Sequence, residues 1–227
     1  MNETQRAITT RFWEAEASRK TLTYPDENIV RFLASRFPDR TKNRGYRVAE
    51  LGCGNGRNMN LLSDYGFVPS GIDLSETAIK TCRELFDYLN REALFFVGAF
   101  QDILSAESRL DLIVWDSPYL DSLAGMQASF SKVFGLLAPG GQLWTRFRHP
   151  DSWFSKLGRS ETDGSIVLDD RAREYANSLY TFLDSEKAEC LLKTTGFEVL
   201  NRERVELWKT MEKERHVWNT FWASRPL

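Results

Sequence analysis

The feature that most constrains the fold is an apolar run that ends in an acid and continues into alternating glycines. Residues 48–56 read Val-Ala-Glu-Leu-Gly-Cys-Gly-Asn-Gly, so a buried strand would lead directly into a glycine-rich loop. Glycine permits positive φ and lets the backbone approach a ligand closely, as nucleotide-binding loops require. Arg57 occupies the third glycine position of the dinucleotide motif G-x-G-x-x-G, so the spacing here differs from that motif.

Two acids narrow the choice of ligand. Residues 66–72 read as a second strand, and Asp73 ends it, where a carboxylate can accept both hydrogen bonds of a ribose diol. Glu50 lies two residues before the first glycine, a favourable place for a cationic group. S-adenosylmethionine has a ribose, no phosphate, and both an ammonium and a sulfonium group. The sequence therefore predicts S-adenosylmethionine as cofactor and S-adenosylhomocysteine as product.

These motifs carry a resemblance to a known family. Residues 50–58 and the run Gly71-Ile72-Asp73-Leu74-Ser75 resemble class I S-adenosylmethionine-dependent methyltransferases. Within that family they look most like the small-molecule branch typified by tellurite-resistance, thiopurine and sugar-modifying methyltransferases. Residues 137–141, Leu-Ala-Pro-Gly-Gly, match the family's turn before the fifth strand. The resemblance covers residues 44–149 well and 182–227 more weakly, and it implies methyl transfer to a small acceptor.

The predicted cofactor site gathers the glycine loop and the ends of the neighbouring strands. It consists of Tyr24, Glu50, Gly52, Cys53, Gly54, Asn55, Arg57, Asp73, Leu74, Ala99, Phe100 and Asp116. In relatives the third strand often ends in an acid that binds the adenine amino group, whereas here Ala99 and Phe100 occupy that region. Phe100 then packs on the adenine or belongs to the core, and Gln101 or Asp102 could supply the polar contact.

The order of predicted elements indicates an α/β fold. Strands are expected at 46–51, 67–72, 94–97, 110–115, 142–148, from 197, and at 216–224; helices are expected at 3–20, 26–37, 57–65, 75–90, 121–137 and 185–195. Alternating strands and helices predict a Rossmann-like, seven-stranded, mostly parallel sheet with helices on both faces and an antiparallel last strand. The expected single domain comprises a helical lid (1–43), a cofactor-binding core (44–149), a substrate-side insertion (150–181), and a C-terminal helix with an antiparallel strand pair (182–227).

Composition bounds the possible partners. Hydrophobic residues make up 42% of the chain and charged residues 27%, which is ordinary for a globular protein. The net charge of −2 offers no general attraction to nucleic acid. The chain has no apolar run of membrane-spanning length and no signal-peptide pattern at its start, so we expect a cytoplasmic protein. Cys53, Cys82 and Cys190 lack metal-like spacing, so no metal site is expected, and the oligomeric state is predicted as monomer or homodimer.

A base is needed if the acceptor is a hydroxyl. His149 directly follows the fifth strand and has an ordinary pKa suited to proton removal at neutral pH, so it is the first candidate; a role in loop packing is the alternative. Asp116 is the second candidate. His216 is expected to be structural or exposed.

The segment Asp116-Ser117-Pro118-Tyr119 supports a different acceptor. Amino-methyltransferases carry Asn/Asp-Pro-Pro-Tyr/Phe after the fourth strand, where oxygen atoms accept hydrogen bonds from an NH₂ group and the ring stacks on it. Ser117 departs from that pattern, so the segment could simply line the crevice. Transfer to nitrogen, to a thiol or metalloid, and cofactor binding without catalysis therefore remain alternatives to transfer to the oxygen of a sugar-like or anionic metabolite.

Predicted substrate-binding residues are Tyr119, Arg146, Arg148 and Trp153. The two arginines share one face of the fifth strand and could bind a carboxylate or phosphate, or could pair internally with Asp111 or Glu50. Trp153, with Phe154 and Tyr180, could form an aromatic wall. Tyr24 would belong to a lid that shields the sulfonium from water.

Overall fold

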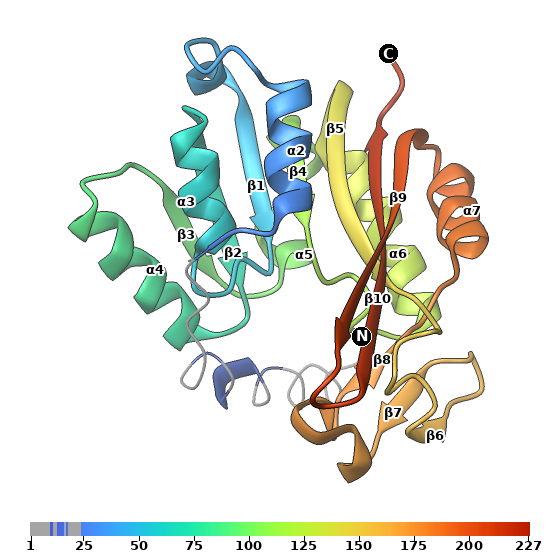
Figure 1. Ribbon diagram of the computed structural model, residues 1–227. Coiled ribbons are helices and arrows are strands. Elements are labelled where there is room, and N and C mark those ends of the chain that lie inside the picture. The colour runs from blue at the N-terminus through green and yellow to red at the C-terminus, as the bar shows by residue number, and fades with distance from the viewer. Residues whose placement is uncertain (1–9, 11–12, 16, 18–23) are drawn as a thin grey trace.

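The computed structural model describes residues 10, 13–15, 17 and 24–227. The helix predicted over 3–20 lies largely outside the described residues. Of the residues that the sequence places on one face of that helix, Ile8, Phe12 and Arg19 lie outside them and Ala15 is described. Figure 1 shows a central sheet whose strands run in the order β3-β2-β1-β4-β5-β10-β9. Its strands are β1 (Arg47–Leu51), β2 (Val68–Asp73), β3 (Leu94–Val97), β4 (Leu110–Trp115), β5 (Leu137–Arg148), β9 (Glu198–Lys209) and β10 (Glu214–Ser224).

The pairing of the strands confirms the predicted fold class. β1 pairs in parallel with β2 and β4, while β10 pairs antiparallel with both β5 and β9. A Rossmann-like, seven-stranded, mostly parallel sheet with an antiparallel last strand is therefore the observed architecture.

Helices cover both faces of this sheet (Figure 1). α2 (Glu27–Arg36), α3 (Arg57–Asp64) and α4 (Glu76–Tyr88) pack on one face, and α6 (Leu123–Leu136) and α7 (Ser185–Thr195) pack on the other. Shorter helical turns are α5 (Phe100–Ile103), η1 (Asn43–Gly45), η2 (Ala106–Ser108) and η3 (Asp170–Tyr175). Asp26 caps α2 by accepting from the Asn28 N–H, and Ser75 caps α4 by accepting from the Ala78 N–H, as those polar residues before apolar stripes predict.

The core alternates along the strands. In β4, Leu112 and Val114 pack toward α2, α3 and α4, whereas Ile113 and Trp115 pack toward α6. Successive side chains of a strand point to opposite faces, so a central strand covered by helices on both sides is apolar throughout. Because β1 to β5 pair in parallel, their carboxyl ends lie together at one end of the sheet.

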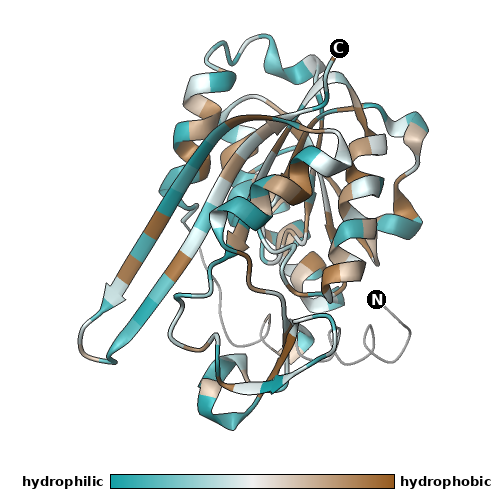
Figure 2. Ribbon diagram, turned by 90° about the vertical axis from the view of Figure 1, so that its right-hand side faces the viewer, coloured by the Kyte–Doolittle hydropathy of each residue, from teal (hydrophilic) through white to brown (hydrophobic). Residues whose placement is uncertain are grey.

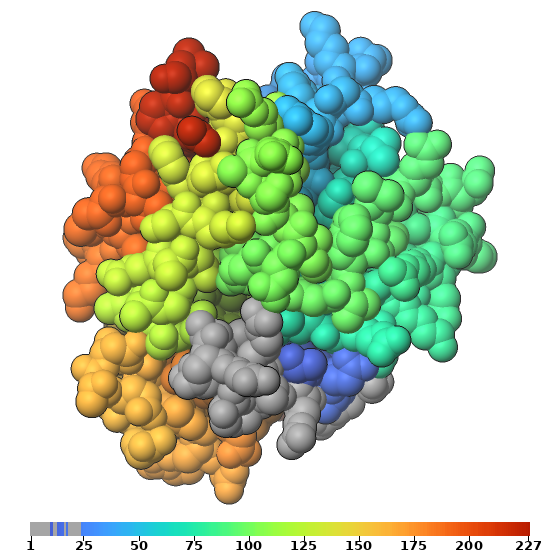
Figure 3. All heavy atoms as spheres, turned by 180° about the vertical axis from the view of Figure 1, so that it is seen from behind, coloured from blue at the N-terminus to red at the C-terminus, as the bar shows by residue number. Residues whose placement is uncertain are grey.

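The segment 150–181 lies beyond that end and contains structure that the sequence pattern did not reveal. It forms a small antiparallel sheet of β6 (Gly158–Ser160), β7 (Ile166–Leu168) and β8 (Leu179–Tyr180). Figure 3 shows the beginning of this segment, in yellow-orange, as a lobe against the core. Strands of two or three residues contain too few alternations to be recognised from sequence.

The last two strands form a long hairpin. β10 begins at Glu214, two residues before the predicted start, because pairing with β9 continues to Lys209. β5 likewise begins at Leu137 instead of at residue 142, through an irregular pairing with β4. Figure 2 shows both hairpin strands reaching past the helices, with hydrophilic and hydrophobic residues alternating along them. Among the helices of the described residues, none has the length and apolar character needed to span a membrane.

Candidate active site

The two predicted motifs meet at the carboxyl ends of β1 and β2. Gly52 and Gly54 adopt φ values of +70° and +52°, which glycine tolerates without strain. The Gly54 N–H donates to Asp73 Oδ2 at 2.8 Å, and the Ser75 N–H donates to Asp73 Oδ1 at 2.9 Å. Each carboxylate oxygen can accept a further hydrogen bond, so Asp73 can still bind a diol. Burial raises the pKa of Asp73.

Two adjoining cavities open around this loop, and both are lined by Gly52, Gly54, Asp73 and Ser117. The first continues along apolar groups that suit a nucleoside base: Ile72, Leu74, Ala99, Phe100 and Trp115. The second continues past Glu50, Cys53, Asn55 and Arg57 to Asp116, Tyr119, Arg146 and Arg148. Gln101 also lines the first cavity, where its side-chain amide is a candidate partner for the adenine amino group.

Tyr24 is the one predicted cofactor residue that lines neither cavity. Its side chain is 83% exposed, because it precedes the cap of α2 on the outside of the molecule. Trp13 lines both cavities instead. Trp13 was not among the predicted site residues, because it lies beside the predicted helical face and not on it. A large aromatic side chain off that face was the signal that could have identified it.

Glu50 is a buried acid with spare hydrogen-bonding capacity. Asn58 Nδ2 donates to Oε1 at 2.8 Å, while Oε2 has no hydrogen-bond partner among the described residues. Burial raises the pKa of Glu50 to about 8. A cationic ligand group would satisfy Oε2 and favour the ionised carboxylate. A Cβ at Gly54 would meet no atom within 4 Å, so this stretch of backbone leaves room for a ligand. The site thus fits S-adenosylmethionine: Glu50 matches the ammonium and Asp73 matches the ribose.

Asp116, at the end of β4, is held by two arginines. Arg146 donates from Nε to Oδ1 at 2.5 Å and from Nη2 to Oδ2 at 2.9 Å, and Arg57 donates to Oδ2 at 3.0 Å. Arg146 also donates from Nη1 to Asp26 Oδ2 at 2.7 Å. Internal pairing of Arg146 therefore occurs, but with Asp116 and Asp26 instead of Asp111 or Glu50. Asp111 lies near the opposite end of β4, where it accepts from the Arg47 N–H.

Arg148 differs from Arg146. It is 5% exposed, and its Nε and Nη1 atoms have no acceptor among the described residues. Its Cζ lies 4.1 Å from the ring centroid of Trp218 and 5.1 Å from that of Phe154. Tyr119, from the predicted substrate segment, lines the same cavity.

Trp153, also predicted to bind substrate, lines neither cavity. Its backbone N–H donates to the Arg215 carbonyl at 2.8 Å, and its ring lies 5.1 Å from Arg173 Cζ. The turn after β5 thus directs this ring toward η3. Tyr175 and Tyr180 of the same segment do line the second cavity. Tyr180 belonged to the predicted aromatic wall, whereas Tyr175 was missed because its polar segment gave no helical or strand pattern.

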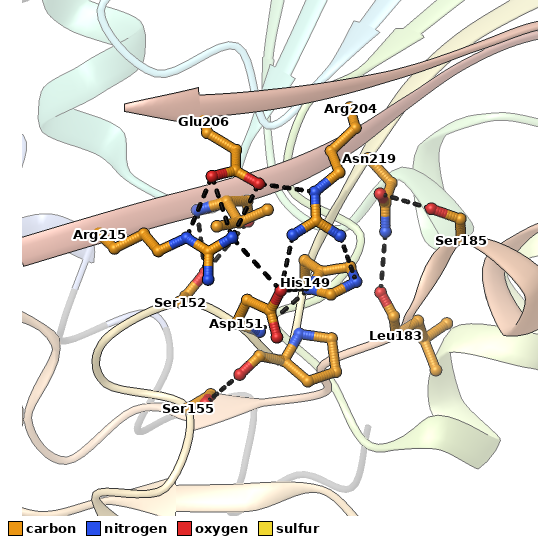
Figure 4. A network of polar contacts seen from close by, with 12 residues as sticks. His149, Asp151, Ser152, Ser155, Leu183, Ser185, Arg204, Glu206, Arg215 and Asn219 are labelled. Atoms are coloured by element: carbon orange, nitrogen blue, oxygen red, sulfur yellow. Dashed lines mark hydrogen bonds and ion pairs between the residues drawn. The ribbon is translucent and has the colours of Figure 1, made fainter. Parts of the chain in front are cut away.

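His149 also lies outside both cavities. Figure 4 shows its ring within a network of charged groups that includes Asp151 and Arg204. Arg204 Nη1 lies 3.1 Å from Nε2, and the Asp151 N–H donates to Nδ1 at 3.0 Å. A neutral imidazole has one acceptor nitrogen, so the hydrogen bond to Nδ1 already engages the lone pair that a general base would need. Burial and the charge of Arg204 lower the pKa of His149.

Strand alternation explains this placement. Arg146 and Arg148 point to the cavity side of β5, so the residue that follows them points to the other side. The geometry accordingly does not bring the predicted base to the cofactor loop. His216 is buried with Nε2 2.9 Å from Glu214 Oε2, in agreement with a structural role.

Comparison with known proteins agrees with this site. Residues 48–141 match the family described as a methyltransferase domain. Methyltransferase OMS1, mitochondrial, from Saccharomyces cerevisiae is 27% identical over 229 aligned residues. The alignment covers 94% of this chain, which spans only 45% of the length of that relative.

Solved structures share the fold. The PH0226 protein from Pyrococcus horikoshii OT3 is 21% identical, with a TM-score of 0.69 over 93% of this chain and 99% of its own. The 1,6-didemethyltoxoflavin-N1-methyltransferase of Burkholderia thailandensis, solved with 1,6-didemethyltoxoflavin and S-adenosylhomocysteine, is 15% identical, with a TM-score of 0.67 over 97% of this chain and 88% of its own. The chain therefore shares its fold with these solved structures, and its residues 48–141 match a methyltransferase domain. The domain match over residues 48–141, together with the chemistry at Glu50 and Asp73, supports S-adenosylmethionine as the cofactor.

Proposed function

We propose that this protein transfers the methyl group of S-adenosylmethionine to a small polar acceptor bound beside Tyr119, Arg146 and Arg148. The observation that carries the proposal is the continuity of the second cavity. It begins at Glu50 and the glycine loop and ends at Tyr119 and Arg148, so cofactor and acceptor can share one cavity. Binding in one cavity favours an in-line displacement because it aligns the reacting atoms.

The residues divide into two groups. In the cofactor half, Asp73 binds the ribose, Glu50 binds the ammonium, and Leu74, Ala99 and Phe100 surround the adenine. When bound, S-adenosylmethionine supplies an electrophilic methyl group on its sulfonium. Arg57 and Arg146 hold Asp116 between the two halves, so its carboxylate is paired internally and fixes the position of both arginines.

A hydroxyl oxygen of a sugar-like or anionic metabolite is the acceptor that the family resemblance favours. A nitrogen acceptor is the second candidate, and a specific observation favours it: arginines contact both predicted bases, His149 and Asp116. Use of either as a base would require that contact to break, whereas a neutral nitrogen can react without prior proton removal.

The cofactor assignment can be tested with a matched pair of glycine substitutions. Gly54 and Gly164 both have positive φ, and a Cβ at either position meets no protein atom within 4 Å, but only Gly54 lines the cavities. Gly54→Ala should weaken S-adenosylhomocysteine binding in calorimetry at least tenfold, while Gly164→Ala should not. Equal losses in both variants, or tighter binding of NAD than of S-adenosylhomocysteine by the wild type, would contradict the assignment.

The acceptor can be sought with methyl-labelled cofactor and fractionated small metabolites, followed by mass identification of the labelled product. An O-methylated product supports the oxygen proposal. An N- or S-methylated product, or tight cofactor binding without turnover of any fraction, would select one of the alternatives. A small-molecule partner, the absence of a nucleic-acid partner, a monomeric or dimeric state and a cytoplasmic location remain predictions.

A further inference from the structure

Arg148 is a buried cation for which the described residues provide no ion pair. Among the described residues no carboxylate lies within ion-pairing distance of it, although its side chain is almost fully buried. Arg146, two residues earlier on the same strand, has both Asp116 and Asp26. Burial of an unpaired charge costs several kcal/mol, so a buried guanidinium normally has an anionic partner. Among the described residues, Arg146 therefore has an anionic partner and Arg148 has none.

The surroundings of Arg148 are aromatic. Its guanidinium lies over the rings of Trp218 and Phe154, at 4.1 and 5.1 Å from their centroids. Tyr119 and Tyr180 stack at 5.5 Å with an interplanar angle of 27°, and both line the cavity that Arg148 lines. Aromatic faces partly compensate a cation, but Nε and Nη1 of Arg148 still have no acceptor among the described residues. They also offer flat apolar surfaces against which a planar ring can stack.

The position of Arg148 separates it from the cofactor half of the site. The aromatic groups around it belong to β10, to the segment 150–181 and, with Tyr119, to the turn after β4, not to the glycine loop. The positive charges nearer that loop, Arg57 and Arg146, are paired with Asp116. An anion at Arg148 would therefore belong to the acceptor, and one uncompensated positive charge matches a monoanion.

We propose that Arg148 binds the carboxylate of a planar aromatic acceptor, and that Arg146 is a positioning residue that holds Asp116. This proposal rests on the methyltransferase function proposed above and specifies its acceptor class. A guanidinium–carboxylate hydrogen bond is charge-assisted and supplies the partner that the buried cation lacks. The tyrosines beside it contact the faces of the ring.

The test uses benzoate and its neutral analogue benzamide as probes. Binding of each to the complex of wild-type protein with S-adenosylhomocysteine is measured by saturation-transfer NMR titration, which detects weak ligands. We expect benzoate to bind at least tenfold more tightly than benzamide. Arg148→Met should reduce this preference to less than twofold, and Arg148→Lys, which keeps the charge, should retain part of it. The control Arg202→Met removes an arginine that pairs with Glu189 at the surface, and it should leave the preference unchanged.

Each other outcome would overturn the proposal. Equal binding of acid and amide by the wild type would exclude a carboxylate site, and an unchanged preference in Arg148→Met would exclude Arg148. Tenfold tighter binding of phenyl phosphate than of benzoate would assign the site to phosphate. A tenfold loss of S-adenosylhomocysteine affinity in Arg148→Met, with benzoate binding unaffected, would assign Arg148 to the carboxylate of the cofactor.

The failure of this proposal can be distinguished from the failure of the methyltransferase function. If the wild type does not bind S-adenosylhomocysteine, the proposed function itself is wrong. If it binds S-adenosylhomocysteine but shows no acid preference, only the acceptor class is wrong. Thermal unfolding of Arg148→Met adds a readout: removal of an unpaired buried cation should not lower its melting temperature, whereas a purely structural role would lower it.

Discussion

At the scale of single residues, the clearest contrast lies between two arginines on one strand. Arg146 is bound by carboxylates from α2's cap and from β4, whereas Arg148 is bound by aromatic faces. The ion pairs of Arg146 join α2 to β4 and β5. The aromatic contacts of Arg148 leave its guanidinium able to bind an anionic ligand, because a ring face cannot accept hydrogen bonds from all of its N–H groups.

The ion pair of Asp116 with Arg146 should contribute to stability. Asp116→Asn leaves a buried guanidinium with a weaker partner, so we expect the free energy of unfolding in urea to fall by about 3 kcal/mol. The control is Asp39→Asn, which breaks an exposed pair with Lys42 and should change the unfolding free energy little. Similar losses in the two variants would show that the Asp116 pair has no special structural role.

Glu50 should make the stability of the cofactor-free protein depend on pH. Its pKa is about 8 in the native state, against about 4.3 in an unfolded chain. Between these values the native state binds more protons than the unfolded state, so stability falls as pH rises, by up to about 1.4 kcal/mol per pH unit from this group. Glu50→Gln should remove this decline. Urea unfolding from pH 5 to 8 measures the difference between the two proteins.

The raised pKa of Glu50 also predicts that cofactor binding releases a proton. If Glu50 binds the ammonium, S-adenosylhomocysteine should favour the ionised carboxylate and release a proton at pH 7. The heat of binding should then depend on the ionisation enthalpy of the buffer for wild type and not for Glu50→Gln. Buffer-independent heats in the wild type would place the ammonium elsewhere.

At the scale of elements, ion pairs connect the hairpin β9–β10 to the chain that follows β5. Arg204 of β9 contacts His149 and pairs with Asp151, and Arg215 of β10 pairs with Glu206 (Figure 4). Arg204→Met should raise the pKa of His149, because a neighbouring positive charge is removed while burial remains. NMR titration of the imidazole carbon signals measures this pKa, with Arg202→Met as the control that should not move it.

The same network predicts the catalytic consequence of removing His149. Once an acceptor is identified, His149→Ala should retain most of kcat, since the ring does not line the cavity. A fall of about 10²–10⁴-fold, typical of a lost general base, would return His149 to the mechanism.

The cap of α4 combines a local and a functional role. Ser75 accepts from the Ala78 N–H and donates its own N–H to Asp73. Ser75→Ala should lower the free energy of unfolding by about 1 kcal/mol, because the cap of α4 is lost. It should also weaken S-adenosylhomocysteine binding, because residue 75, whose backbone N–H donates to Asp73, is then held less firmly. Ser122→Ala removes the cap of α6, which accepts from the Gly125 N–H. It should cost similar stability and leave cofactor affinity unchanged; a parallel affinity loss would show a general effect of destabilisation.

At the scale of the whole molecule, the cofactor should stabilise the fold as a unit, because its predicted site draws on β1, β2, β4 and the turn at α5. S-adenosylhomocysteine at 100 times its Kd should add about 2.7 kcal/mol. For a chain of this size that corresponds to a rise in Tm of roughly 5–11 °C. Thermal unfolding with and without ligand measures the rise, which NAD should not reproduce. A wild-type Tm insensitive to saturating S-adenosylhomocysteine would contradict this coupling.

The sequence by itself determined the features that depend on neighbours in the chain. The glycine loop, Asp73 at the end of β2, the caps at Asp26 and Ser75, and the alternation of strands and helices all follow from short-range patterns. Backbone conformation, side-chain period and capping are local properties, so sequence reasoning predicted the sheet, and its proposed cofactor residues other than Tyr24 line the two cavities.

Only the tertiary structure decided how the charged and aromatic groups at the end of β5 are used. Arg146 finds Asp26 across 120 positions of sequence, and His149 finds Arg204 across 55. Trp13 enters the cavity from before the first strand, while the predicted Trp153 is turned away from it. A long side chain at a strand end can reach several partners, and which of them is near depends on segments that the sheet brings together from far along the chain. For that reason the sequence could name Arg148 as a substrate-binding candidate, but only the folded arrangement showed that the described residues offer it no anion.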